Sequence, residues 1–96
     1  LNMSEEILPI VETVEDYMAI QEMAPDDSEL PRTFNEWKRK EGVERAKPLD
    51  GHDHRVEVPI SADELQQTCL ELQVEPSFMA LRMSAIQKNH SRVIGI

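Results

Sequence analysis

The feature that most constrains the fold is an alternating apolar run at residues 54–60. Apolar Val56, Val58 and Ile60 alternate with Arg55, Glu57 and Pro59, a pattern that predicts a half-buried strand. Pro59 has no N–H to donate to a ladder, so the strand either lies at a sheet edge or ends there. One strand cannot satisfy its own backbone hydrogen bonds. The pairing partner is therefore residues 92–96, residues 7–11, or the same strand of a second chain.

Two helices are predicted directly after this strand. Ser61 and Glu64 form a capping box that predicts a helix over residues 62–73. Its apolar stripe consists of Leu65, Cys69 and Leu72. Ser77 predicts the start of a last helix over residues 78–89, and residues 92–96 are the candidate for a second, terminal strand.

The amino-terminal half predicts two further helices. Thr13 and Asp16 form an imperfect capping box for a helix over residues 14–24, and Thr33 and Glu36 form a capping box for one over 34–46. Residues 1–12 are assigned to a flexible or extended arm, with a helical turn ending before Pro9 as the alternative. The predicted fold class is α+β and mainly helical, with about four short helices and one short strand in a single domain, 1–96.

Charge narrows the classes of partner. The chain of 96 residues has a formal net charge of -9, which disfavours binding to nucleic acid or to an anionic membrane. Residues 1–31 hold nine acidic side chains and no Lys or Arg, whereas residues 32–47 hold six basic ones, so we expect the two segments to attract each other. The sequence contains no apolar stretch long enough to cross a membrane and no secretory signal is visible. With a single cysteine, these features favour a cytoplasmic, bacterial-type protein.

Few side chains suggest chemistry. His52 and His54 have the spacing of a weak metal site, for which Glu57 or His90 would have to supply further ligands. Cys69 lies on an apolar stripe and is expected to be a buried hydrophobe rather than a nucleophile. No phosphate-binding glycine loop or acid/base pair is visible, so we predict no enzyme, no catalytic residue and no cofactor.

The predicted last helix has an apolar arc wider than one core contact needs. Met79, Met83 and Ile86 form a stripe beside that of Phe78, Leu81 and Ala85, and Arg82 projects between them. This second stripe either touches the amino-terminal helix of the same chain or forms an interface with a second copy or another protein. Arg82 is expected to pair with a carboxylate.

The predicted strand and its two helices resemble the ribbon-helix-helix repressors. The resemblance rests on Arg55-Val56-Glu57-Val58-Pro59-Ile60, the following Ser61-Ala62-Asp63-Glu64-Leu65, and the turn Leu72-Gln73-Val74-Glu75-Pro76-Ser77. It implies a symmetric dimer in which two copies of strand 54–60 pair antiparallel and contact DNA. The groove-facing side of that strand, however, offers Arg55, Glu57 and Pro59, of which only Arg55 suits a base or a phosphate. Residues 62–89 also resemble a helix-turn-helix in which Ser77 begins the reading helix.

Three functions follow from these patterns. The first is a non-enzymatic protein-interaction or regulatory module that forms a homodimer or binds a protein partner. The second is a DNA-binding repressor or antitoxin. The third is an acidic mimic of nucleic acid, in which the carboxylates of residues 5–29 occupy a basic groove of another protein.

Overall fold

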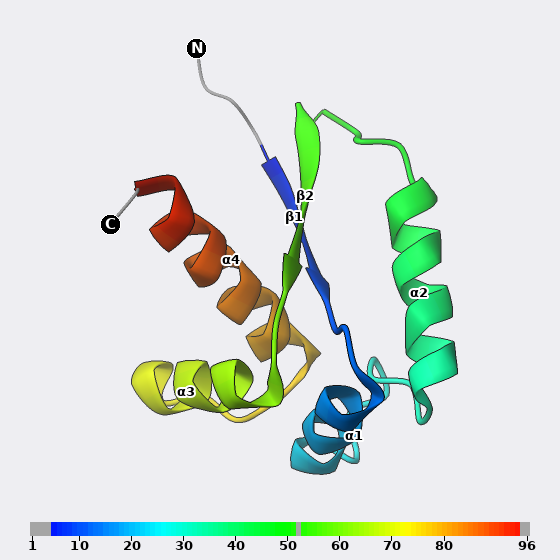
Figure 1. Cartoon of the computed structure of the whole chain (residues 1–96), viewed down its shortest axis with the longest axis vertical. Coiled ribbons are helices and arrows are strands. Elements are labelled where there is room, and N and C mark those ends of the chain that lie inside the picture. The colour runs from blue at the N-terminus through cyan, green and yellow to red at the C-terminus, as the bar shows by residue number, and fades with distance from the viewer. Residues whose placement is uncertain (1–4, 52, 95–96) are drawn as a thin grey trace.

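The computed structural model describes residues 5–51 and 53–94 and contains a small, mainly helical α+β fold (Figure 1). In chain order the described elements are β1 (Glu5–Ile10), α1 (Val14–Met23), α2 (Phe34–Ala46), β2 (His54–Pro59), α3 (Ala62–Leu72) and α4 (Phe78–Ile94). The predicted fold class and the four predicted helices are confirmed. None of the described helices is long and apolar enough to cross a bilayer.

The strand that pairs with β2 is β1, which lies parallel to it with Ile7 opposite Val56. The prediction of a terminal strand at residues 92–96 was wrong for residues 92–94, which continue α4; residues 95 and 96 lie outside the described part of the chain. The physical reason is that no Pro or Gly interrupts the chain between Phe78 and Ile94, so continuing the helix costs little.

Each strand of the sheet contains one proline, Pro9 in β1 and Pro59 in β2. In both strands the proline nitrogen, which has no hydrogen to donate, faces the outer edge rather than the other strand. Ile10 C=O accepts a hydrogen bond from Ile60 N–H at 2.9 Å, so Ile10 faces β2. Backbone N–H and C=O groups alternate in direction along a strand, so Pro9 on β1 faces away from β2. The parallel register likewise places Pro59 on the outer edge of β2. Neither proline removes a ladder hydrogen bond, which is why a strand forms across Pro9.

Helices cover both faces of the sheet (Figure 1). On one face, Ile7 and Val56 pack against the main core, and α4 lies over both strands. On the other face, Arg45 of α2 holds Glu57 of β2 with hydrogen bonds of 2.7 and 2.8 Å. The result is a three-layer arrangement of α4, sheet and α2, with Leu8 buried on the α2 side.

Hydrogen bonds at the starts of the helices connect the amino-terminal segment to α3 and α4. The capping boxes predicted at Thr33 and Ser61 are both present. Asp16 of α1 accepts a hydrogen bond from Ala62 N–H at the start of α3, at 3.0 Å. Asp27 does the same for Phe78 N–H at the start of α4, at 2.8 Å. Acidic side chains of the amino-terminal segment therefore satisfy orphan N–H groups of later helices and complement their dipoles.

Candidate protein-binding groove

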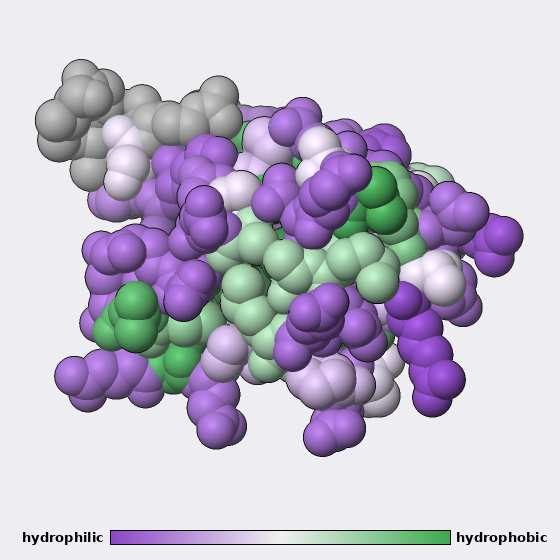
Figure 2. Space-filling model, turned by 60° about the horizontal axis from the view of Figure 1, so that its bottom comes forward, coloured by the Kyte–Doolittle hydropathy of each residue, from purple (hydrophilic) through white to green (hydrophobic). Residues whose placement is uncertain are grey.

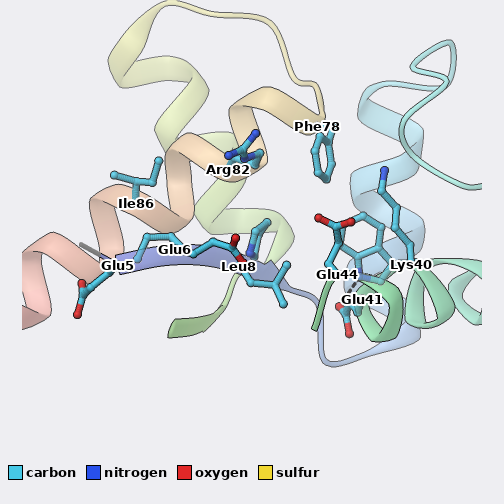
Figure 3. Close-up of a pocket in the computed structure, with 12 residues that line it drawn as sticks. Glu5, Glu6, Leu8, Lys40, Glu41, Glu44, Phe78, Arg82 and Ile86 are labelled. Atoms are coloured by element: carbon cyan, nitrogen blue, oxygen red, sulfur yellow. Dashed lines mark hydrogen bonds between the residues drawn. The ribbon is translucent and has the colours of Figure 1, made fainter. Parts of the chain in front are cut away.

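A groove runs along the outer edge of β1, the edge that does not pair with β2 (Figure 3). β1 forms its floor, α2 forms one wall and α4 forms the other. Its volume is about 390 Å³. The described residues that line it are Glu5, Glu6, Ile7, Leu8, Pro9, Trp37, Lys40, Glu41, Glu44, Phe78, Arg82 and Ile86.

The floor of the groove offers backbone hydrogen-bonding groups. Since Ile10 faces β2, alternation turns Glu5, Ile7 and Pro9 toward the groove. The N–H and C=O of Ile7 and the C=O of Pro9 therefore point away from the only strand that pairs with β1 in the described chain. Glu5, Glu6 and Ile7 are half-buried in this stretch, whereas Leu8 and Pro9 are buried. We call the stretch Glu5–Pro9 the open edge. An open edge is a ready template for another strand.

At Val11 the same edge is closed by side chains of α2. Val11 N–H donates to Glu41 Oε2 at 2.9 Å, and Val11 C=O accepts from Lys38 Nζ at 2.9 Å. The Glu41 side chain is 2% exposed and also accepts a hydrogen bond from Trp37 Nε1. Its second oxygen, Oε1, forms an ion pair with Lys38 Nζ at 2.7 Å. Glu41 and Lys38 thus replace a neighbouring strand at this position, which we call the closed end.

The α4 wall presents one apolar and cationic stripe. Phe78, Arg82 and Ile86 are spaced by four residues and lie on one side of the helix. Ile86 is 50% exposed. On the opposite wall, Lys40 Nζ lies 4.1 Å from the centre of the Phe78 ring and donates to Glu29 C=O. Apolar surface is therefore available beside the open edge, with cations next to it.

The carboxylates of the groove are already engaged. Glu41 pairs with Lys38, Glu44 with Lys47 and Glu6 with Arg55. Glu5 accepts hydrogen bonds from His54 at 2.8 Å and from Asn89 at 3.0 Å, and these lower the pKa of its carboxyl. None of these partners lines the groove. Within the described chain, Lys40 and Arg82 are the two lining cations, and neither has a carboxylate partner.

The structure separates the predicted interface residues into two groups. Arg82 and Ile86 line the groove, whereas Met79 and Met83 lie beside it on the same helix. Met79 is 58% exposed, and Arg82 is exposed with no carboxylate partner among the described residues. The carboxylate partner expected for Arg82 is not found among the described residues, because the lining carboxylates are bound to other groups.

Of the two weak metal candidates, the structure describes His54. His54 hydrogen-bonds Glu5, and His52 lies outside the described residues. In the part of the chain that the structure describes, no three His, Cys, Asp or Glu side chains are grouped as metal ligands would be. Cys69 is buried in the core, and its burial raises the pKa of the thiol.

A second exposed apolar surface lies at the end of the molecule where α1 packs. Figure 2 shows a band of weakly apolar surface there, bordered by hydrophilic side chains. On α1, Val14 and Met18 are each a little over two-fifths exposed. This surface offers no strand edge, so it has fewer ways to orient a partner than the groove.

The sequence did not reveal Ile7, Trp37, Lys40 or Glu41 as site residues. Trp37 and Glu41 are spaced by four residues, so they share one face of their helix. A carboxylate four residues after a tryptophan, on the same face of the helix, is the signal that could have marked Glu41. Searches against protein-family models, curated proteins and solved structures found no match to the chain.

Proposed function

We propose that this protein is a non-enzymatic binding module that takes up an extended segment of another protein along the open edge of β1. The observation that carries the proposal is the position of that edge, on the floor of a groove between two helices. An added strand would hydrogen-bond the backbone of Ile7, in the half-buried part of the open edge, and place alternate side chains against the walls. Backbone pairing would supply affinity and the walls would supply selectivity.

A single extended segment suits the groove better than a second copy of the chain. In a symmetric dimer built on this edge, each copy would have to bring its own β1, which lies between its own α2 and α4. Each copy would therefore bring two helices to the same pair of edges. A peptide segment has no such walls, and neighbouring strands need a separation of only about 4.8 Å.

The other hypotheses have less support. The ribbon-helix-helix resemblance implies antiparallel pairing of strand 54–60 between two chains, whereas β2 lies parallel to β1 of the same chain. Nucleic-acid mimicry needs the carboxylates of residues 5–29 on one exposed face. Asp16 and Asp27 instead accept hydrogen bonds from the starts of α3 and α4, and Glu5 is bonded to His54.

Selection from a displayed library of short random peptides tests the proposal. Trp37, the single tryptophan, lines the groove and reports occupancy by its fluorescence. We expect selected peptides to change Trp37 emission and to shift the amide signal of Ile7 in ¹⁵N–¹H spectra. Peptides that bind elsewhere, or a protein that only self-associates through β1, would overturn the proposal.

A further inference from the structure

The groove carries an excess of unpaired positive charge on a strongly acidic protein. The chain as a whole has a net charge of -9. Each carboxylate that lines the groove is nevertheless bound to a group outside the lining: Lys38, Lys47, Arg55 or His54. Lys40 and Arg82 are left without a carboxylate partner in the described chain.

The two cations are not equivalent. Lys40 lies over the Phe78 ring and donates to the Glu29 carbonyl, so its ammonium group already has partners. No hydrogen bond or ion pair within the described chain involves the Arg82 guanidinium, which lies on α4 between Phe78 and Ile86. A guanidinium group presents a planar fork of donors that matches a carboxylate. Arg82 is therefore the lining group with unused charge and unused donors.

We propose that the extended segment bound in the groove carries an acidic residue flanked by apolar ones, with its carboxylate on Arg82. This inference rests on the proposed function and names the chemistry of the partner. The apolar neighbours of the acidic residue lie along Phe78 and Ile86, which occupy the same side of α4 one turn before and one turn after Arg82. The acidic surface elsewhere repels such a segment, so the attraction is local to the groove.

The test is to repeat the peptide selection on three proteins: the unchanged chain, Arg82→Glu and Arg39→Glu. Arg39 lies exposed on α2 and does not line the groove. The two variants have the same net charge, so a difference between them reports position rather than overall charge. Both substituted side chains are exposed, and far-ultraviolet circular dichroism checks that each variant folds.

We expect Asp and Glu to be enriched at one position of the peptides selected on the unchanged chain and on Arg39→Glu, and not on Arg82→Glu. A selected acidic peptide should bind about three- to tenfold more weakly to Arg82→Glu than to Arg39→Glu. The inference is overturned if groove-binding peptides show no acidic enrichment, or if both variants lose it equally. Those outcomes leave the proposed function intact, whereas failure to select any groove-binding peptide would overturn both.

Discussion

The backbone groups at the two ends of the outer edge of β1 differ in whether the fold satisfies their hydrogen bonds. At Val11 both backbone groups are satisfied by side chains of α2, Glu41 and Lys38. At Ile7, four residues earlier, the backbone faces a groove lined by Phe78, Arg82 and Ile86. The comparison shows that side chains of this fold can close a strand edge where no second chain is needed. The open edge around Ile7 is the stretch at which a partner strand could pair.

The largest expected effect comes from opening the closed end. Glu41→Ala should lower the free energy of unfolding by about 3 kcal/mol, because Val11 N–H and Trp37 Nε1–H lose their buried acceptor. Urea denaturation measures this. The control is Glu44→Ala, which removes a surface ion pair with Lys47 and should cost at most about 1 kcal/mol. Equal losses would mean that Glu41 does not hold the closed end.

The buried Tyr17, which packs against Trp37 beside the closed end, predicts a loss of folding stability at alkaline pH. Tyr17 is fully buried and stacks on Trp37 at 5.4 Å between ring centres; burial and the nearby Glu36 raise the pKa of its hydroxyl to about 12. The folded state binds this proton more tightly than the unfolded state. The stabilisation is therefore complete below pH 10 and is lost as the pH rises toward 12, by about 2 kcal/mol. Urea denaturation between these pH values checks it, and Tyr17→Phe should flatten the dependence. A variant that keeps the full dependence would assign it to other groups.

A smaller effect is expected at the open edge. Pro9→Ala restores a backbone N–H that faces the groove, and one extra donor should tighten the binding of a selected peptide about fivefold, which titration of Trp37 fluorescence can measure. Pro59→Ala makes the same change on the outer edge of β2, which does not line the groove. If both variants bind the peptide equally tightly, the groove gives the β1 edge no special role.

Much of the fold could be predicted from local signals. Capping residues at Thr33, Ser61 and Ser77 mark helix starts, and the alternation over 54–60 marks β2. Local signals do not select the partner of β2 among residues 7–11, residues 92–96 and a second chain. Pro9 is a residue that usually breaks regular structure, and a strand covered by helices on both faces shows no clean alternation. The pairing of β1 with β2 spans 49 residues, from Glu5 to His54, and no local pattern encodes such a contact.

The site was predictable only in part. The wide apolar arc of the last helix indicated Ile86 and Arg82, both of which line the groove. Ile7 and Glu41 were missed because their roles depend on which strand edge stays unpaired and which helix lies beside it. Those are properties of the tertiary arrangement rather than of spacing along the chain.

Hydrogen exchange of two amides tests the central comparison most directly. In the free protein we expect the Val11 amide, bonded to Glu41, to exchange slowly and the Ile7 amide to exchange fast. A selected peptide should slow Ile7 by at least about tenfold and leave Val11 nearly unchanged. The account is contradicted if Ile7 is already protected in the free protein, or if a bound peptide leaves its exchange rate unaltered.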